Sequence, residues 1–235
     1  MSKSLAIMQP YIFPYIGYFQ LINSVDEFVI YDNIQYTKKG WINRNRILMN
    51  GKDSLITVTL KKDSDFLNIV DREISKDWVK ERVKILNQIK SSYKKSPYFD
   101  EVFFLIERCL MNSNSNLFEF IYDSICDINE YFGIKTKMIK SSELQINHDL
   151  KSKDKVIEIC KNQNADIYIN AIGGMELYDK EDFKNNGIQL NFIKSNPIKY
   201  KQFENEFVPW LSIIDVMMFN SKEEISNYIK NYTLV

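Results

Sequence analysis

The sequence predicts an α/β protein with a Rossmann-like, mostly parallel sheet, and three observations support this prediction. Short apolar runs of strand length alternate with helical patterns near both ends of the chain. An apolar run, a helical segment and a second apolar run follow one another within residues 5–31, and a crossover of this kind joins parallel strands. The same alternation returns after a long helical stretch, from about residue 137 onward.

The first elements follow from their composition. Residues 5–8 are apolar and too few for a helix, residues 15–23 form the first helix, and residues 27–31 form the second strand. Residues 47–49 and 55–60 predict a hairpin, because the Asn50-Gly51 pair between them favours a type I′ turn.

Residues 77–132 predict a helical insertion within a single domain that spans residues 1–235. Apolar side chains recur there at helical spacing in three stretches. The stretches are separated by Ser96-Pro97 and by the polar run at 112–116. The first stretch contains Trp78, Val79, Val83, Leu86 and Ile89. Aromatic residues at this spacing indicate core packing and not a cofactor site.

The strand pattern then resumes. Strands at 137–139, 166–170 and 188–193 alternate with helices at 154–162 and 181–186, and two short helices follow them within 210–228. We expect the first strand to lie in the centre of the resulting sheet.

The composition excludes several classes of protein. With 31 basic and 31 acidic side chains the net charge is zero, so we expect no nucleic-acid partner. No apolar run is long enough to span a membrane and no signal peptide is recognisable, so we expect a cytoplasmic location. Three cysteines in apolar helical patterns and a single histidine, His148, in a polar loop favour no metal site. No glycine-rich nucleotide motif is present, which leaves the cofactor unknown.

Residues 9–19 are the most informative stretch, because they follow the first strand and combine aromatic, amide, proline and glycine residues. Open α/β sheets bind ligands outside the carboxyl ends of their strands, so this turn predicts a binding floor. We expect its aromatic rings to stack on a base or sugar. The candidate ligand-binding residues are Gln9, Pro10, Tyr11, Phe13, Gly17 and Tyr18.

A second candidate segment follows the strand predicted at 166–170. Asn170 ends that strand, and the adjacent Gly173 and Gly174 would let a ligand approach the backbone and its N–H groups. Tyr178 completes the segment. The alternative is a turn that starts a helix, with Glu176 and Tyr178 on its surface.

A third candidate is an arginine pair near the predicted hairpin. On an extended strand, Arg44 and Arg46 share one face while Asn43 and Asn45 take the other. Two guanidinium groups on one face suit a phosphate or carboxylate, because each can bond two oxygens at once. The alternative is a solvated pair on an exposed strand.

Two aspartates are candidates for a general base. Asp32 follows the second strand and would lie near Gln9 and Gln35, where it could bond a sugar hydroxyl or an amine, or equally cap a turn. Asp215 has apolar neighbours, and burial without a partner would raise the pKa of its carboxyl. Ser212 lies three residues before Asp215, as in a helix capping box. A structural role is therefore the alternative for Asp215, as turn capping is for Asp32.

Four segments resemble the WbqC-like protein family, and they run in the family's order across nearly the whole chain. They are residues 9–19, 41–47, 168–178 and 207–220, with Met175 in a variable position of the third. The resemblance implies a role in bacterial surface-polysaccharide biosynthesis (O-antigen or capsule), with transfer of glycine or another amino-acyl group to an amino sugar.

One leading hypothesis and two alternatives follow. The leading hypothesis is an acyl or amino-acyl transferase that acts on a nucleotide-linked amino sugar, with Asp32 or Asp215 accepting the proton of the attacking amine. The first alternative is a non-catalytic ligand-binding or assembly protein of the same pathway. The second is an ATP-dependent amide ligase, because the opening of the chain looks like that of the HIGH-type nucleotidyltransferases, with Tyr15 and Tyr18 near the places of their two histidines.

Overall fold

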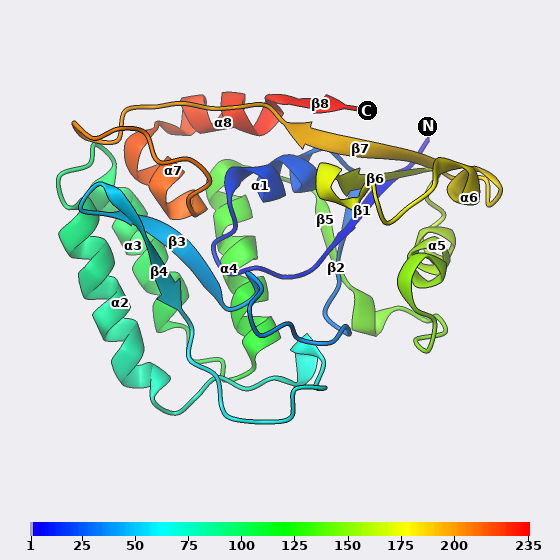
Figure 1. Ribbon diagram of the computed structural model, residues 1–235, viewed down its shortest axis with the longest axis horizontal. Helices are drawn as coiled ribbons and strands as arrows, with labels where there is room; N and C mark the ends of the chain where they lie inside the picture. Colours follow the sequence, from blue (N-terminus) through cyan, green and yellow to red (C-terminus); the bar gives the residue numbers. More distant parts are fainter. Residues whose placement is uncertain (1) are drawn as a thin grey trace.

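A six-stranded sheet forms one half of the computed structural model, which describes residues 2–235 (Figure 1). The strands run in the order β5-β2-β1-β6-β7-β8, and every neighbouring pair is parallel except β7 and β8. The predicted α/β class with a mostly parallel, Rossmann-like sheet is therefore confirmed. The strands are β1 (Ser4–Met8), β2 (Glu27–Ile30), β5 (Lys137–Lys140), β6 (Ile167–Ala171), β7 (Gln189–Ser195) and β8 (Tyr232–Leu234).

The first strand lies inside the sheet, between β2 and β6, as the sequence predicts. The chain leaves β1 to form β2 and β5 on one side, and later crosses to the other side of β1 to form β6 and β7. The carboxyl ends of β1 and β6 are therefore the point at which the strand order reverses. Open α/β sheets bind their ligands at this switch point.

Helices cover both faces of the sheet. Leu5 and Ile7 of β1 belong to one buried cluster, which includes residues of α5 (Ser152–Asn162) and α6 (Lys180–Lys184). Ala6 belongs to a second and larger cluster, which includes residues of α1 (Ile16–Asn23) and α8 (Lys222–Lys230). Because alternate side chains of a strand point to opposite faces, the two sets of helices lie on opposite sides of β1.

Three long helices occupy the predicted helical insertion, and they extend the larger buried cluster away from the sheet (Figure 1). The helices are α2 (Trp78–Tyr93), α3 (Phe99–Met111) and α4 (Leu117–Phe132). The side chain of Asn116 caps the start of α4, and Gly133 ends it in a left-handed conformation. The predicted apolar stripe of α2 is wrong at Val79 and Val83, whose side chains are exposed.

The predicted hairpin is present, but it forms a separate two-stranded sheet made of β3 (Arg44–Met49) and β4 (Lys52–Thr57). Asn50 and Gly51 have φ angles of 52° and 75°, as a type I′ turn requires. Both strands begin earlier than predicted. β3 packs against α2 and against α7 (Ile213–Phe219), which brings the hairpin toward the loop that follows β1 (Figure 1).

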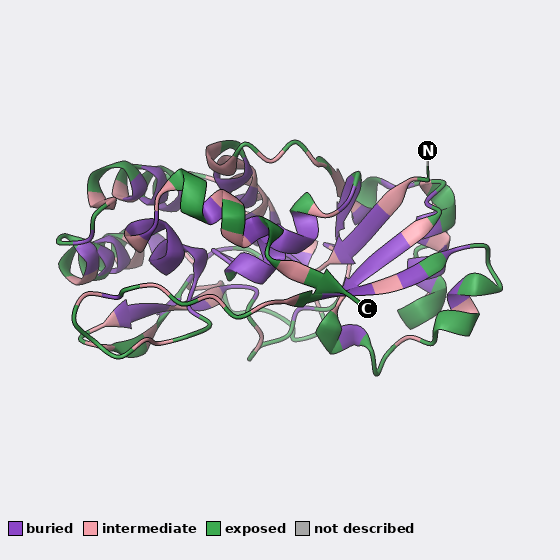
Figure 2. Cartoon of the chain, turned by 90° about the horizontal axis from the view of Figure 1, so that it is seen from above, coloured by how far each residue is buried: buried purple, intermediate pink, exposed green. Residues whose placement is uncertain are grey.

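Figure 2 shows that burial is concentrated in the parallel strands and the inner helix faces, whereas the edge strand β8 is largely exposed. β8 was not predicted, because three residues of mixed polarity carry no periodic signal. Three short 3₁₀ helices complete the fold: η1 (Ile69–Asp71), η2 (Ser141–Glu143) and η3 (Ile172–Gly174). Among residues 2–235, no helix is both long enough and apolar enough to cross a membrane.

Candidate ligand-binding site

A cavity of about 420 Å³ lies at the carboxyl ends of β1 and β6, and we call it the switch-point crevice. Its position is the one that the strand order favours for a ligand. Six of the residues proposed from the sequence line it: Gln9, Tyr11, Asn170, Gly173, Gly174 and Tyr178. Two segments that are more than 150 positions apart in the chain therefore meet here, because β1 and β6 are neighbours in the sheet.

The floor of the crevice is held by the end of β1. The hydroxyl of Tyr18 donates to the backbone oxygen of Gln9 at 3.0 Å, and the hydroxyl of Tyr11 donates to the Gln9 side-chain oxygen at 3.3 Å. The backbone N–H of Tyr31 donates to the oxygen of Met8 at 2.8 Å. Within the described residues the amide nitrogen of Gln9 has no acceptor, so it is free to donate to a ligand.

The opposite wall is built around a close approach of Asn170 to Gly174. A Cβ atom on Gly174 would lie 2.1 Å from the amide nitrogen of Asn170, so any larger residue at that position would have to displace the Asn170 side chain. The Asn170 side-chain oxygen accepts from the N–H of Ala171 at 2.9 Å, and its amide nitrogen has no acceptor among residues 2–235. Gly173 differs, since a Cβ there would meet nothing within 4 Å.

The remaining polar groups of the crevice are phenols. Burial raises the pKa of Tyr31 to about 12, and it also raises the pKa of Tyr11 and of Tyr178. These hydroxyls therefore stay protonated at neutral pH. In the part of the chain that the structure describes, no charged side chain lines the crevice. Amides, phenols and aromatic rings without charge suit a ligand rich in hydroxyl groups.

A buried lysine lies just behind this wall. Lys155 of α5 is only 3% exposed, and its ammonium lies 5.1 Å from the centre of the Tyr31 ring. Its contacts are oxygen atoms of Asn33 at 3.3 Å and of His148 at 3.4 Å, and none of the described carboxylates pairs with it. Burial lowers the pKa of Lys155, against the opposing effect of Asp32. No sequence pattern predicts this burial, because a lysine in an amphipathic helix is normally exposed.

Asp32 lies at the end of β2, but it does not reach the crevice. It is fully buried, and its carboxylate accepts from the Ser141 hydroxyl at 2.6 Å, from the Ser142 backbone N–H at 2.9 Å and from the Ser142 hydroxyl. These bonds fasten η2 to β2. A general base must lie within hydrogen-bond reach of the substrate. The geometry therefore corrects the expectation for Asp32 and favours the structural alternative.

A second cavity of about 220 Å³ adjoins the crevice and shares Tyr11 with it. We call it the aromatic–arginine pocket; it is lined by Tyr11, Pro14, Tyr15, Trp41, Asn45, Arg46 and Trp210. Trp41 and Trp210 are exposed, at 44% and 62%. Sequence reasoning did not select Tyr15, Trp41 or Trp210, although all three lie inside the segments that it quoted.

Arg46 supplies the charge of this pocket. Its guanidinium lies 5.5 Å from the centre of the Trp41 ring, donates to the Trp210 carbonyl at 3.1 Å, and pairs with Asp53 at 3.3 Å. Its Nε is buried and has no acceptor among the described residues. An arginine with a free N–H and a weak, exposed acidic partner can still bind an anion.

Arg44 shares the face of β3 with Arg46, as predicted, but its guanidinium is directed to backbone carbonyls. Its Nε donates to the Gly40 carbonyl at 3.0 Å, and a terminal nitrogen donates to the Lys39 carbonyl. Asn43 is buried on the other face, where it accepts from the Tyr36 hydroxyl and donates to the Val58 carbonyl. Both side chains therefore hold backbone in place and do not face either cavity.

The loop from Ile12 to Pro14 is clamped between the hairpin and the start of α7. The Asn45 amide donates to the carbonyl oxygens of Ile12 and Phe13, and the Ser212 hydroxyl also donates to Phe13 at 2.8 Å. Ser212 in addition caps α7 through the N–H of Ile214. Its role is thus to position the loop, since it is fully buried and lines no cavity.

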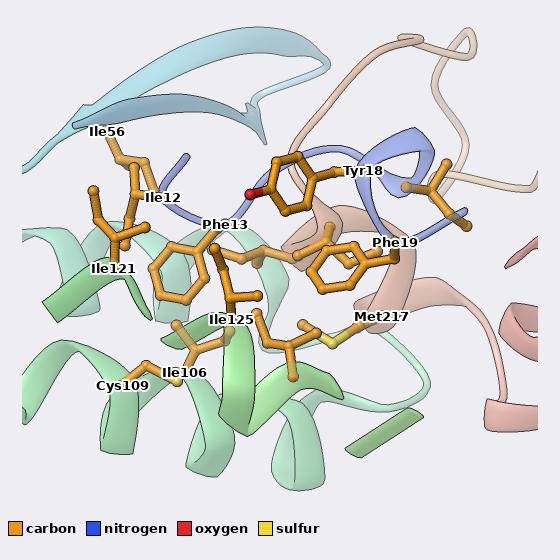
Figure 3. Close-up of a cluster of buried hydrophobic side chains, with 14 of the residues drawn as sticks. Ile12, Phe13, Tyr18, Phe19, Ile56, Ile106, Cys109, Ile121, Ile125 and Met217 are labelled. Carbon is orange, nitrogen blue, oxygen red and sulfur yellow. The ribbon is translucent and has the colours of Figure 1, made fainter. Parts of the chain in front are cut away.

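Figure 3 shows Phe13 and Tyr18 inside the apolar core, where they pack among side chains of the helical insertion and of α7. Phe13 is fully buried at a positive φ of 43°, and Tyr18 is 3% exposed. Neither ring can stack on a ligand, which corrects that expectation. Pro10 and Gly17 are buried too; Gly17 lets the Tyr15 ring lie where a Cβ would be 2.3 Å from it.

Asp215 and Gln35 lie apart from the crevice. The Asp215 carboxylate is fully buried and accepts from the Tyr93 hydroxyl at 2.9 Å and from Tyr200 and Gln202 at 2.6 Å each. Burial raises its pKa, and the three hydrogen bonds oppose that effect. Gln35 is exposed and donates to the Asp65 carbonyl at 3.1 Å. The position of Asp215 therefore favours the structural role over that of a general base.

The sequence is similar to known proteins over nearly its whole length. The profile of the WbqC-like protein family matches residues 9–227. An uncharacterized protein of Mycobacterium tuberculosis, Rv1507c, is 29% identical over 232 residues, which covers 97% of this chain and 98% of that relative. No solved structure matches the chain.

Proposed function

Because the chain belongs to the WbqC-like protein family, we propose that it acts in bacterial surface-polysaccharide biosynthesis, as an acyl or amino-acyl transferase for a nucleotide-linked amino sugar. The observation that carries the proposal is the switch-point crevice, where uncharged hydrogen-bonding groups from β1 and β6 face a cavity of about 420 Å³. A cavity of this size holds a small organic ligand.

The lining of the crevice supports a sugar as its occupant. The free amide nitrogens of Gln9 and Asn170 can donate to hydroxyl or acetamido oxygens, and the phenols of Tyr31 and Tyr178 can both donate and accept. The tyrosine rings offer apolar faces to the C–H side of a pyranose. A small anion would bind only weakly in the crevice, because no charged group of the described chain lines this cavity.

The neighbouring pocket supports a phosphate beside the sugar. Arg46 lies across the shared Tyr11, and its guanidinium, whose acidic partner Asp53 is exposed, supplies a positive charge for a phosphate. Arg44 is not needed for this role, since its donors bind backbone carbonyls. An uncharged subsite next to a cationic one matches the two ends of a sugar phosphate.

The proposed reaction needs an activated acyl donor, such as a thioester. The neutral amine of the sugar attacks the carbonyl carbon, the C–N bond forms, the C–S bond breaks, and the amine proton ends on the departing thiolate. Phenol hydroxyls of Tyr31 and Tyr178 would donate to the carbonyl oxygen as it gains negative charge. Their raised pKa values keep them protonated for that task.

Ligand binding tests the first half of the proposal. UDP- and dTDP-linked amino sugars at about 100 times their Kd should stabilise the folded chain by about 2.7 kcal/mol. That corresponds to a rise in Tm of roughly 5–10 °C for a chain of this size. Asn170→Ala and Tyr178→Phe should reduce the rise, whereas Gln35→Ala, outside both cavities, should not. If no nucleotide-linked sugar raises the Tm, the proposal fails.

Product analysis tests the second half. The full chain is incubated with a bound amino sugar and a set of acyl and amino-acyl thioesters, and acylated sugar is sought by mass spectrometry. Tyr31→Phe and Tyr178→Phe should slow product formation more than they weaken binding. A donor that yields product at the same rate without protein would contradict a catalytic role.

A second candidate function is non-catalytic binding or assembly in the same pathway. It is favoured by one observation: Asp32 and Asp215 are fully buried, and the crevice has no acidic or basic lining residue in the described chain. This candidate predicts tight sugar-nucleotide binding without product for any acyl donor. The amide-ligase alternative loses support, because Tyr18 is buried and bonded to Gln9.

A further inference from the structure

A third cavity, of about 360 Å³, continues from the aromatic–arginine pocket, and we call it the apolar groove. It lies between the start of α1, the segment 195–200 after β7, and the segment 207–211. Tyr15 and Trp210 line both cavities, at the place where the two adjoin. The groove is lined mainly by apolar and aromatic side chains, among them Ile16, Ile198, Tyr200 and Phe207.

The three cavities form a row with a defined chemical order. The switch-point crevice and the aromatic–arginine pocket share Tyr11, and the pocket and the groove share Tyr15 and Trp210. Along this row the lining changes from uncharged and polar, to cationic at Arg46, to aromatic and apolar. A nucleotide-linked sugar has the same order: a sugar rich in hydroxyls, an anionic diphosphate and a flat base.

We propose that the apolar groove is the nucleobase subsite of this protein, with the base stacked on Trp210. This inference rests on the proposed function and adds to it an orientation: sugar in the crevice, diphosphate at Arg46, base in the groove. It also names residues outside the crevice, Trp210 and Ile198, that determine which activated sugar is accepted.

Trp210 is suited to stacking. Its indole is 62% exposed, and the Tyr15 ring contacts it at 5.9 Å with the ring planes inclined at 62°, so most of the indole surface stays free to stack. Its backbone has a positive φ of 60°, which is unfavourable for a tryptophan. The bond from Arg46 to the Trp210 carbonyl and the buried Leu211 that follows hold this conformation.

The segment after β7 favours a base over a purely apolar occupant. Within the described chain, the backbone N–H groups of Ile198, Lys199 and Tyr200 donate to no other residue, and these three residues line the groove in irregular backbone. Backbone donors and acceptors of this kind can pair with the edge of a base. A hydrocarbon tail would leave them unpaired beside an apolar surface.

Calorimetry on the full chain tests the inference. The probes are UDP, dTDP, CDP and GDP, the sugar nucleotide that binds tightest, and N-acetylglucosamine phosphate as a ligand without a base. We expect Trp210→Ala to weaken the tightest nucleoside diphosphate about tenfold or more, because base stacking on an aromatic side chain is lost. Trp210→Phe, which keeps a ring, should stay close to wild type.

A filling variant gives independent evidence. Ile198→Trp should block the groove and weaken nucleoside diphosphates as strongly as Trp210→Ala, while the affinity for N-acetylglucosamine phosphate stays unchanged in both variants. Val79→Trp, at an exposed position of α2 that lines none of the three cavities, is the matched control and should change nothing. Ligand-free melting curves establish that each variant is folded.

The outcomes separate the inference from the function on which it rests. If sugar nucleotides bind and neither groove variant changes their affinity, the inference is overturned while the proposed function stands. If farnesyl diphosphate binds in competition with the sugar nucleotide and no nucleoside diphosphate binds, the groove takes a lipid tail and the inference is again overturned. If neither sugar nucleotides nor the sugar phosphate bind, the proposed function itself is wrong.

Discussion

The side-chain amide nitrogen of Asn170 lies 2.1 Å from the point that a Cβ atom on Gly174 would occupy. The end of β6 and the turn after it are thus fitted to each other at the wall of the crevice. A methyl group at Gly174 would displace the side-chain amide of Asn170, whose nitrogen is a hydrogen-bond donor at the cavity.

Gly174→Ala should therefore weaken sugar binding about two- to tenfold, the value of one net hydrogen bond. Gln35→Ala is the control, because this exposed residue lies outside both cavities. Calorimetric titration of both variants with one sugar nucleotide gives the comparison. Equal affinities would show that Asn170 does not contact the ligand.

Arg46→Ala should weaken a phosphate-bearing ligand about ten- to hundredfold, because a charge-assisted hydrogen bond is lost. Arg44→Ala removes the same charge from the same strand face, but its donors bind backbone carbonyls and not a cavity. It should leave the affinity near that of wild type. A similar loss in both variants would mean that only the general positive charge matters.

Asp32→Asn should lower the free energy of unfolding by about 1–3 kcal/mol, because the buried carboxylate loses charge-assisted bonds from Ser141 and Ser142. Turnover of the folded variant should stay near wild type. Urea unfolding measures the first effect, and initial rates the second. A folded variant with a rate about 10²–10⁴ times lower would restore Asp32 as a general base.

The pH dependence of stability should carry the signature of Asp215. Burial raises its pKa in the folded state above the unfolded value of about 3.9, so the folded state holds the proton more tightly. Stability should then fall as the pH rises from about 4 through the raised pKa. Asp215→Asn has no such titration, so its free energy of unfolding relative to wild type should rise over that window. A constant difference from pH 4 to pH 7 would contradict this.

Lys155→Met should unfold at a higher urea concentration than wild type near neutral pH. Burial lowers the pKa of Lys155 in the folded state, so folding at this pH works against a desolvated charge, and methionine keeps most of the apolar stem. The advantage should shrink as the pH rises through the lowered pKa, where the lysine becomes neutral. Lys161→Met, at an exposed position of the same helix, is the control.

The local parts of the fold could be predicted from the sequence. β1, α1 and β2 follow from short-range apolar patterns, and Asn50-Gly51 specifies its turn by its own backbone preference. The central place of β1 and the meeting of Gln9 with Asn170 follow from the rule that parallel strands end at one edge. To predict that Gln9 and Asn170 meet, it is enough to know that their two strands are neighbours.

The side-chain roles depended on partners that the sequence does not place. Asp32 and Asp215 are satisfied by hydroxyls from η2 and from Tyr93, more than 100 positions away in the chain. In the irregular loop after β1, no periodicity tells which ring faces inward, and the positive φ of Phe13 turns that ring into the core while Tyr11 and Tyr15 reach the cavities. The segment that contains Trp210 is irregular as well, so no periodicity predicts that its ring lines a cavity.

The hydrogen bond from Ser212 to Phe13 spans 199 positions of the chain. During synthesis at about 5–20 residues per second, the loop after β1 must wait roughly 10–40 seconds for the serine that fastens it. Until then the loop is held only from the side of the hairpin and the helical insertion, so the nascent protein can build the first strands early but completes the cavity only near the end of translation. A translational pause before residue 212 should therefore prolong chaperone contact without delaying the formation of β1 and β2.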